Sequence, residues 1–531
     1  MPSITIREED NTLYGINTLT NDNIVYVPGN TITGPSENPV LVASYDQFIN
    51  TFGQSGVAGS PTFNYATGIL LAGMPILFQR ITTNGINSSD SLVKSATVPI
   101  QNQAKDKTIA TINERYGGSY GNSLSVTLMK EADQNAVYLR VYYGAANKQI
   151  EAVKLVDIES EMTDEQINAA LYNALLTTSF ETVTIDIPVI DPPTTAENFT
   201  WTPIPESGKT PVAMTGGEDA DNTKILETLK MPFGNSSFYS IVTDKYVYDL
   251  KFVTSGGYTD QITDTGTTPI AVAMDGLAQA RKDCVAIADI PFGAIPPTVD
   301  VTKFFSAVDS DYSTAFAPWV YMKLNNRESA WMAPSFVFLT TLAASLKNNP
   351  IWYPPAGVGR ATVTNAVKTE YEIGGAMLSQ WQDSTSTQAI NPIMKLRNYG
   401  YVIYGQRTLR MPTGSDPTIQ SALRSLNVRI TANEIKKQIF NACIYLTFEQ
   451  NIQRTWNEFK AQVEPLLFKM QSNRGLTDYQ IIMDTTTISE TDLAENRIRG
   501  IVRVSIVNAV EYFDIGFELE PSNVTFTGEE L

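Results

Sequence analysis

Residues 427–487 read NVRITANEIKKQIFNACIYLTFEQNIQRTWNEFKAQVEPLLFKMQSNRGLTDYQIIMDTTT. Apolar residues recur at three- and four-residue spacing in two parts of this stretch, 435–446 and 456–470. This spacing lays one apolar stripe along each of two predicted helices. Pro465 predicts a kink in the second helix, and Arg474-Gly475 predicts its end, with the glycine as C-cap.

After the second helix the pattern changes to the alternation typical of strands. Tyr479, Ile481 and Met483 alternate with other residues, and the same period recurs in 501–506 and 515–519. The sequence therefore predicts a small α/β module of two helices followed by strands. Nothing in it has the pattern of a catalytic site.

The order of these segments resembles the C-terminal domain of contractile tail sheath proteins, the family of phage tails, tailocins and related injection systems. In that family an I-K-K run leads into an F-E-x-N turn and a T-W helix start, which stand here at 435–437, 448–451 and 455–456. A D-x-T-T-like strand end follows, here at 484–487. The resemblance rests on the ordered series of all these runs, and any one of them alone supports it less.

Upstream segments resemble the same family in the same order, from about residue 24 onward. They are the G-P-x-x-x-P-V turn at 34–40, the helix ending in F-G at 52–53, the strand 75–81 with Arg80, the strand and glycine turn at 249–258, the strand 280–291, the Pro318-Trp319 run at 312–322, the helix and turn at 333–357, and the N-P-I to G-x-R-T-L run at 390–409. Ala333 stands where the family has the first proline of a P-P-S helix start.

Length and composition predict a folded, multidomain protein. The chain has 531 residues, 43% hydrophobic and 18% charged, which predicts two to four domains. Its net charge of −18 argues against a nucleic-acid groove, which needs clustered Lys and Arg. Histidine is absent, so every catalytic triad with a histidine base is excluded.

Cysteine usage and hydropathy bear on the compartment. Cys284 and Cys443 are the two thiols, and each adjoins an apolar run, so a buried, reduced pair is favoured over a disulfide. The N-terminal MPSITIREED lacks the pattern of a secretory signal. The longest apolar run, 65–78, is too short to span a bilayer and contains Pro75, so no membrane partner is expected.

The predicted fold class is a multidomain α/β (α+β) protein, with an α/β core built from N- and C-terminal parts, an inserted β-rich domain, and extended strand arms at both termini. Within the insertion, 163–176 predicts a helix opened by a capping box, and the Pro- and Thr-rich piece 191–211 predicts an exposed loop. The expected divisions are an N-terminal linker arm at 1–23, the middle α/β domain at 24–104 and 231–410, the inserted β-rich outer domain at 105–230, a C-terminal tube-facing α/β domain at 411–512, and a C-terminal strand or linker at 513–531.

Three alternative sites are weighed against ordinary structure. Residues 117–121 satisfy the G-x-S-x-G pattern of hydrolases, but a strand pattern follows where the nucleophile elbow needs a helix, so Gly121-Asn122 is interpreted as a turn. The acidic runs at 8–10, 218–219 and 529–530 lack calcium-loop spacing and are interpreted as solvated charge. No P-loop is present, and no catalytic residue, cofactor or metal is expected.

The terminal strands are candidate intersubunit elements. Ile4 and Ile6 at one end, and Ile515, Phe517 and Leu519 at the other, predict lone strands whose unpaired N–H and C=O groups could pair with another chain. The family resemblance implies that each C-terminal domain accepts such strands from neighbouring subunits. A mesh of this kind could change pitch while staying connected.

Arg424, Arg429, Lys436 and Lys437 form a basic cluster in an otherwise acidic chain. An ordinary exposed helix face is the slightly favoured explanation of this cluster. The functional hypothesis is a contact with an acidic tail tube, because the resemblance implies a C-terminal domain that lines the sheath lumen.

The resemblance implies a structural, non-enzymatic sheath subunit. Such a subunit polymerises as stacked rings of a helical homo-oligomer around a tail tube, and contraction drives the tube through the target cell envelope. The implied partners are the tube protein, the baseplate and the tail terminator, without direct nucleic-acid contact, and the implied location is the virion tail after assembly in the host bacterial cytoplasm. The sheath of a secretion or extracellular injection system is the alternative, and a hydrolase with a β-rich accessory domain is a remote one.

Overall fold

The computed structural model describes residues 23–509, apart from 84–90, 132, 206–209, 236, 261, 263–267, 325–327, 383–388, 415–419 and 496. The chain divides into two compact units, residues 1–437 and 438–531. The predicted terminal arms, apart from Asn23, lie outside the described residues.

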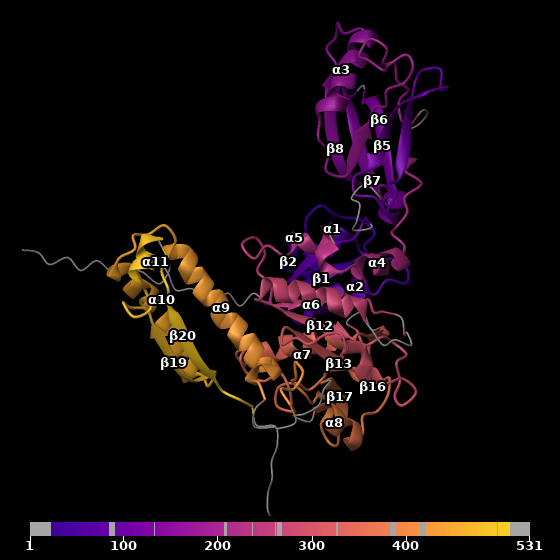
Figure 1. Ribbon diagram of the computed structural model, residues 1–531. Coiled ribbons are helices and arrows are strands. Elements are labelled where there is room, and N and C mark those ends of the chain that lie inside the picture. The colour runs from indigo at the N-terminus through magenta and orange to yellow at the C-terminus, as the bar shows by residue number, and fades with distance from the viewer. Residues whose placement is uncertain are drawn as a thin grey trace, which may run out of the picture. The chain divides into compact units, whose positions relative to one another are not determined.

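The first unit is organised around an eight-stranded sheet (Figure 1). Its strands, in spatial order, are β18 (Gly400–Ile403), β17 (Asn391–Leu396), β13 (Ser313–Ala317), β12 (Val285–Asp289), β11 (Phe252–Val253), β1 (Val25–Gly29), β3 (Ile76–Arg80) and β2 (Val40–Val42). The six strands from β17 to β3 run parallel, and an antiparallel strand closes each edge. Residues 25–80 and 252–403 thus build one sheet, which confirms the predicted α/β core made from two separate parts of the chain.

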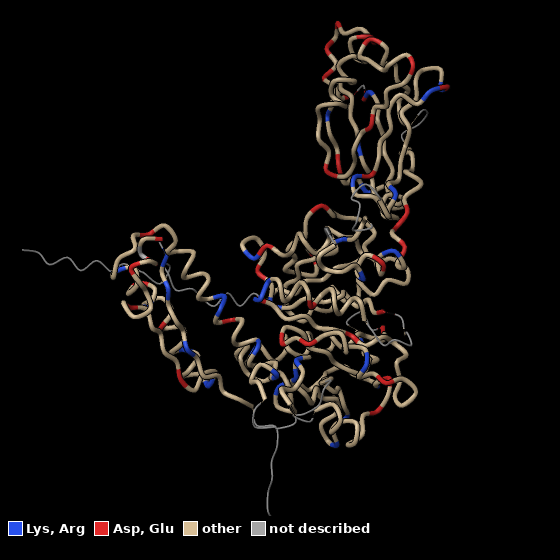
Figure 2. Tube along the Cα trace, in the orientation of Figure 1, with Lys and Arg blue, Asp and Glu red and all other residues tan. Residues whose placement is uncertain are grey.

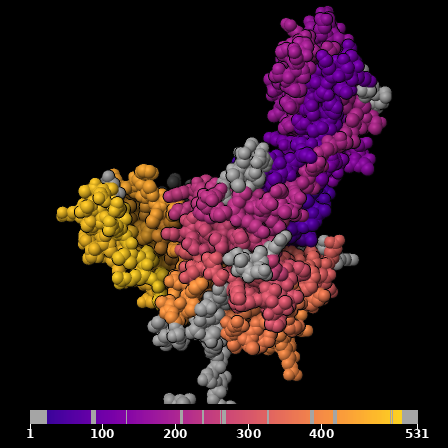
Figure 3. All heavy atoms as spheres, turned by 45° about the vertical axis from the view of Figure 1, so that its right-hand side comes forward, coloured from indigo at the N-terminus to yellow at the C-terminus, as the bar shows by residue number. Residues whose placement is uncertain are grey.

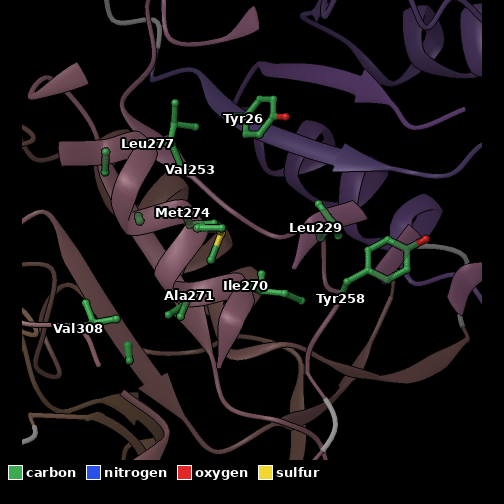
Figure 4. Close-up of a cluster of buried hydrophobic side chains, with 14 of the residues drawn as sticks. Tyr26, Leu229, Val253, Tyr258, Ile270, Ala271, Met274, Leu277 and Val308 are labelled. Carbon is green, nitrogen blue, oxygen red and sulfur yellow. The ribbon is translucent and has the colours of Figure 1, made fainter. Parts of the chain in front are cut away.

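Both faces of the sheet are buried, which explains why its central strands are almost continuously apolar. Tyr26 and Leu77 point into one core cluster, whereas Val25 and Val27 point into the other. Figure 4 shows Tyr26 and Val253 with Met274 and other side chains of the first cluster.

Helices cover the two faces. The first face carries α4 (Asn222–Leu229), η3 (Phe233–Asn235), α5 (Ser237–Ile241), α6 (Pro269–Arg281), η4 (Val301–Phe305) and α8 (Gly375–Gln382). The second carries α1 (Tyr45–Phe52), α2 (Thr62–Ala72) and α7 (Pro334–Leu346), together with the small sheet of β15 (Ser329–Met332), β14 (Val320–Lys323) and β16 (Ala366–Thr369). The predicted helix that ends at Phe52-Gly53 is confirmed as α1, and the Ser44 side chain accepts from the Gln47 N–H and caps its start.

The region between the two parts of the sheet is rich in strands, as predicted. One sheet contains β4 (Thr97–Gln101), β5 (Thr108–Glu114) and β9 (Val183–Asp186), and the other contains β10 (Val212–Ala213), β6 (Leu124–Glu131), β7 (Ala136–Tyr143) and β8 (Lys148–Asp157). Helix α3 (Asp164–Thr177) opens with the predicted capping box of Thr163 and Gln166. In Figure 3 the indigo and magenta atoms of this region form one packed body with its own core.

The predicted exposed loop at 191–211 is partly wrong. Phe199, Trp201 and Ile204 are 1%, 6% and 7% exposed and belong to the core of the inserted region. The Ile204 N–H and C=O both bond to Leu128 of β6, at 2.7 and 2.5 Å. The Pro- and Thr-rich composition of the loop led to the prediction of exposure. These three apolar side chains instead pack in one core with residues of both sheets.

The remaining elements follow the middle α/β region. They are η6 (Ala422–Arg424), α9 (Leu426–Leu446), α10 (Gln453–Ser472), β19 (Leu476–Ile482), α11 (Glu490–Ala494) and β20 (Ile501–Ile506). The predicted order of two helices and two strands is confirmed, whereas the third strand predicted at 515–519 lies outside the described residues.

Arg80 at the end of β3 is 2% exposed and uses all five of its N–H groups. Nε and Nη2 donate to Thr31 C=O at 3.2 and 2.9 Å, and Nη1 donates to Gly34 C=O at 2.8 Å. Nη1 and Nη2 also donate to Tyr116 C=O and Gly117 C=O, at 2.8 and 2.6 Å. One guanidinium therefore joins the loop after β1 of the core sheet to the loop after β5 of the inserted region.

The charge of Arg80 persists in this buried place. Burial lowers the pKa of Arg80 to about 10, against the opposing effects of Glu114 and Asp219, so the side chain stays protonated at neutral pH. The Glu114 carboxylate is held in turn by the Thr33 hydroxyl at 3.1 Å and the Tyr116 N–H at 3.2 Å.

Asp289, the last residue of β12, caps the start of α7. The N–H and hydroxyl of Ser335 donate to its two carboxylate oxygens at 2.7 and 2.6 Å, and the Ser335 Oγ lies 2.7 Å from the Tyr65 hydroxyl. No cation pairs with Asp289 among the described residues. Burial raises the pKa of Asp289 to about 7, although the bonds from Ser335 oppose the rise.

We expect Arg80→Met to lower the free energy of unfolding of the first unit by about 3 kcal/mol, because four buried carbonyls lose their donors at once. Urea denaturation followed by tryptophan fluorescence measures this loss. Arg454→Met is the control, since the Arg454 side chain is 83% exposed and its removal is expected to change stability by less than about 0.5 kcal/mol. Equal stability of the two variants would contradict the central role of Arg80.

We expect Asp289→Asn to gain stability relative to the parent chain as pH rises from 4 to 7. The raised pKa means that Asp289 contributes its stability at low pH and loses it as the pH rises through about 7. Asn does not titrate, so the difference in unfolding free energy between the variant and the parent chain should change with pH by on the order of a few kcal/mol. Denaturation at pH 5 and pH 8 tests this, with exposed Asp186→Asn as the control. A pH-independent difference would show that the carboxyl is ionised throughout.

Candidate assembly surfaces

The predicted basic cluster does not form one exposed surface. Arg424 and Arg429 are 1% and 3% exposed, so neither can reach a partner outside this chain. Lys437 is half-buried and Lys436 is exposed. In Figure 2, Lys and Arg are dispersed among Asp and Glu along the trace. The prediction of four accessible contact residues is therefore wrong for the two arginines, and the tube contact of the lysines stays a prediction.

The two arginines hold chain segments of the first unit together instead. Arg424 Nε donates to Arg410 C=O at 3.1 Å. Arg429 pairs with Asp311 and places its guanidinium carbon 4.3 Å from the centre of the Tyr312 ring. Asp311 lies 118 residues away from Arg429 in the chain, so this burial could not be predicted from the residues around Arg429.

The two lysines differ from one another in exposure and in their partners. Lys437 pairs with the Asp249 carboxylate and also donates to Leu250 C=O. Lys436 donates to the Tyr312 hydroxyl at 2.9 Å while its side chain remains exposed. Of the four predicted residues, Lys436 is the one whose charge faces solvent.

Other side chains of α9 also bind the start of this helix to the rest of the first unit. Lys251 and Glu434, 10% and 5% exposed, form an ion pair at 3.1 Å, and Asn433 donates to Cys284 C=O at 3.2 Å. Leu426 and Ile430 are buried in the core cluster of α1, α2 and α7. The first three turns of α9 therefore belong to the first unit. The sequence showed the apolar spacing but not these charged partners.

The predicted pair of buried cysteines is half right. Both thiols are free; Cys284 is buried, but Cys443 on α9 is exposed. The predicted apolar stripe is buried at Ile435 and Ala442 and ends before Cys443.

The second unit is built on α10, which packs against β19 (Figure 1). The predicted stripe is confirmed, since Trp456, Phe459, Val463, Leu467 and Met470 are all buried. The helix runs on through Pro465 to Ser472.

The end of α10 differs from the prediction by one residue. Arg474, with φ of 59°, takes the left-handed conformation that we expected of Gly475. The Gly475 N–H instead bonds to Met470 C=O at 2.8 Å.

Strands β19 and β20 form a two-stranded antiparallel sheet. Among the described residues neither outer edge is paired with a further strand. An isolated two-stranded sheet is marginally stable in water, and an unpaired edge offers N–H and C=O groups to another strand. Side chains of β20 alternate between exposed and half-buried, and Ile501 is 45% exposed. The predicted mesh requires unpaired edges of this kind, and the role of this sheet as a strand acceptor stays a prediction.

The candidate strand residues themselves, Ile4, Ile6, Ile515, Phe517 and Leu519, lie outside the described residues. The description resumes at Asn23, two residues before β1, and ends three residues after β20. Their intersubunit role stays a prediction.

The G-x-S-x-G run forms the predicted turn. Residues 119–123 make a short 3-10 helix, η2 (Ser119–Ser123), directly followed by strand β6. A Cβ on Gly118, whose φ is 127°, would lie 2.1 Å from Ile32 C=O, so close packing of two loops requires a glycine there. Gly118 in this run therefore serves the close packing of these loops.

Two further observations concern other kinds of site. In the described part of the chain, no cluster of three or more His, Cys, Asp or Glu residues is arranged to hold a metal ion. None of the helices described combines the length and apolar character that a membrane crossing needs.

Comparison with known proteins gives sequence relatives for part of the chain. No protein-family model matches it. It is 22% identical over 308 residues to a tail sheath protein of Vibrio phage KVP40, covering 54% of this chain and 44% of the relative. It is 23% identical over 259 residues to the tail sheath protein of Enterobacteria phage T4, covering 49% of this chain and 36% of the relative. The matched regions span less than half the length of either relative.

Solved structures extend the similarity of fold to almost the whole chain. A sheath tail protein from Listeria innocua has a TM-score of 0.57 at 10% identity, covering 91% of this chain and 95% of that one. One from Desulfitobacterium hafniense has a TM-score of 0.53 at 10% identity, covering 96% and 100%. The contracted helical sheath of the anti-feeding prophage has a TM-score of 0.50 at 12% identity, covering 98% and 99%. These sequence and fold similarities confirm the predicted resemblance to contractile tail sheath proteins.

Proposed function

We propose that this chain is the structural, non-enzymatic subunit of a contractile sheath. The subunit polymerises as a helix of stacked rings around a tail tube, and contraction of that helix drives the tube through a cell envelope. The proposed partners are further copies of the chain, the tube protein, and the baseplate and terminator proteins at the two ends. The proposed location is the tail of a virion that assembles in the bacterial cytoplasm.

The observation that carries this proposal is the two-stranded sheet of β19 and β20. Both of its outer edges are free of strand partners in the described part of the chain. The segments 1–22 and 510–531 each contain an alternating apolar run that could supply the missing strands of a neighbouring copy. A contact made by one end of a subunit on a different surface of the next copy need not close, so it builds a helix of open length.

Strand exchange also suits contraction. Backbone hydrogen bonds join subunits regardless of side-chain identity, and the chain between a donated strand and its own unit can reorient. If the extended and contracted lattices differ by about 1–2 kcal/mol per subunit, hundreds of coupled subunits make conversion effectively irreversible, since about 5.5 kcal/mol already moves a two-state system from 1:99 to 99:1. The extended state is then held kinetically by its contacts with tube and baseplate.

A sheath of an extracellular injection system is the second candidate. It is favoured by the fold similarity to the anti-feeding prophage sheath, which covers 98% of this chain. The sequence matches to phage tail sheath proteins cover 54% and 49%. The genes next to this one, which would encode either a capsid or a toxin payload, separate the two.

We expect deletion of residues 1–20 to give a folded monomer that does not polymerise, because the donated N-terminal strand is lost. Sedimentation and negative-stain microscopy measure polymerisation, and circular dichroism checks that the helices and strands are retained. Tubes formed by the truncated chain would refute the role of the N-terminal strand.

We expect Lys436→Glu and Lys437→Glu to have different effects. Lys437→Glu loses the pair with half-exposed Asp249 and should cost about 1–2 kcal/mol of stability, which Asp249→Lys in the same chain should restore. Lys436→Glu should leave stability within about 0.5 kcal/mol and weaken assembly of sheath on tube.

Thermal melting and co-sedimentation with purified tube separate these two readouts. Unchanged assembly of the Lys436→Glu variant on the tube would rule out the proposed contact at this lysine. A Lys437→Glu variant that the Asp249→Lys change fails to rescue would show that their pairing does not stabilise α9.

A further inference from the structure

A groove of about 460 Å³ runs along the outer seam between α2 and α7, a size within the range of ligand-binding clefts. Its walls are apolar at Phe63, Leu71, Met322 and Phe336. Leu71 is 47% exposed, so the groove leaves a large apolar side chain in contact with water. Nothing in the proposed function above uses this groove.

The groove follows from close packing of the two helices. A Cβ on Gly68 of α2 would lie 2.4 Å from the Phe336 ring of α7, so the glycine lets the helices approach. Their first turns meet where the hydroxyls of Tyr65 and Ser335 lie 2.7 Å apart. The first turn of α7 is bonded to Asp289 at the carboxyl end of β12, and α2 ends shortly before the amino end of β3. Both helices therefore run from the carboxyl edge of the sheet to its amino edge.

The groove is basic in an acidic protein. Lys323 and Lys347 line it, both are exposed, and its lining contains no Asp or Glu. Among the described residues neither lysine forms an ion pair or side-chain hydrogen bond. With a net charge of −18 on the whole chain, two unpaired lysines beside an apolar floor favour an occupant that is both acidic and apolar.

The N-terminal segment enters the fold beside this groove. The Val25 N–H bonds to Pro75 C=O at 3.1 Å, so the amino ends of β1 and β3 are adjacent. Helix α2 ends at Ala72, three residues before Pro75. Asn23 and the amino-edge end of the groove therefore lie at the same edge of the sheet and on the chain's own first unit.

Residues 4–14, ITIREEDNTLY, have the composition that the groove requires. Glu8, Glu9 and Asp10 are consecutive acids, with Ile4 and Ile6 before them and Leu13 and Tyr14 after them. The eight residues between Tyr14 and Asn23 can extend about 30 Å, whereas a helix with its side chains is about 10–12 Å across. The segment is therefore long enough to pass around α2 and reach the groove of the same chain.

We propose that, in the unassembled subunit, residues 4–14 dock in the α2–α7 groove of their own chain, with the acids against Lys323 and Lys347. One consequence rests on the proposed function: a docked N-terminal segment cannot pair with another copy, so docking would delay polymerisation until the segment is released. The groove is then a storage site that controls when the strand becomes available.

Two measurements on the full chain at low concentration test the docking. A carbodiimide joins carboxylates to amines that are in contact, and it should link Glu8, Glu9 or Asp10 to Lys323 or Lys347. An equal mixture of isotope-labelled and unlabelled protein should give links within one chain. Hydrogen exchange should show backbone amides of residues 4–14 protected at least tenfold over their unprotected rates.

The variants are chosen to keep the fold and change the groove. Ala344→Trp fills the groove from an exposed position of α7 and keeps both lysines, so it should abolish the links and the protection. Ala280→Trp, at an exposed position of α6, is its control. Lys323→Glu with Lys347→Glu should also abolish protection, and adding Glu8→Lys and Glu9→Lys should restore it. Lys107→Glu with Lys148→Glu, both exposed in the inserted region, is the control of equal charge.

Equal exchange of residues 4–14 in the Ala344→Trp variant and the parent chain would overturn the proposal. Links between differently labelled chains would also overturn it, because they would assign the groove to a second copy. Negative-stain microscopy is scored separately. If the segment docks but the parent chain forms no tubes at any concentration, the proposed sheath function is refuted and the docking proposal stands. If tubes form but the segment does not dock, the docking proposal is refuted and the sheath function stands.

Discussion

The fold depends on one buried cation at the point where the chain leaves its core sheet for the inserted region. The Arg80 guanidinium binds four carbonyl oxygens, two from the loop after β1 and two from the loop between β5 and β6. Each of those carbonyls would otherwise be a buried acceptor without a donor. A planar group with five fixed donors meets this demand, and a lysine with three donors on one nitrogen does not.

An insertion of more than a hundred residues separates two parts of the chain that still build one sheet. The sheet's strands from 25–80 and 252–403 pair directly, so the core does not need the inserted region for its hydrogen bonds. The inserted region has its own apolar core, from Ala96 to Met214. What the two share is concentrated at Arg80 and the loops around it, where Gly118 allows close approach.

Local features were predictable from sequence and distant ones were not. The caps at Ser44 and Thr163 and the apolar stripe of α10 depend on residues within one or two turns, so their patterns are visible in the sequence. Arg429 and Lys437 appeared as members of an exposed basic cluster, because their partners lie 118 and 188 residues away. Phe199 and Trp201 were hidden by a loop-like composition for the same reason: the core that buries them is assembled from strands elsewhere in the chain.

The different surroundings of the two cysteines give this protein a natural chemical handle. Cys284 is buried, and burial raises its pKa to about 12, so its thiol is protected from reagents both by packing and by protonation. Cys443, on the half of α9 that lies in the second unit, is exposed. A maleimide dye would therefore attach at one place without any engineered residue, and its fluorescence would follow in real time how the surroundings of that helix change as subunits meet.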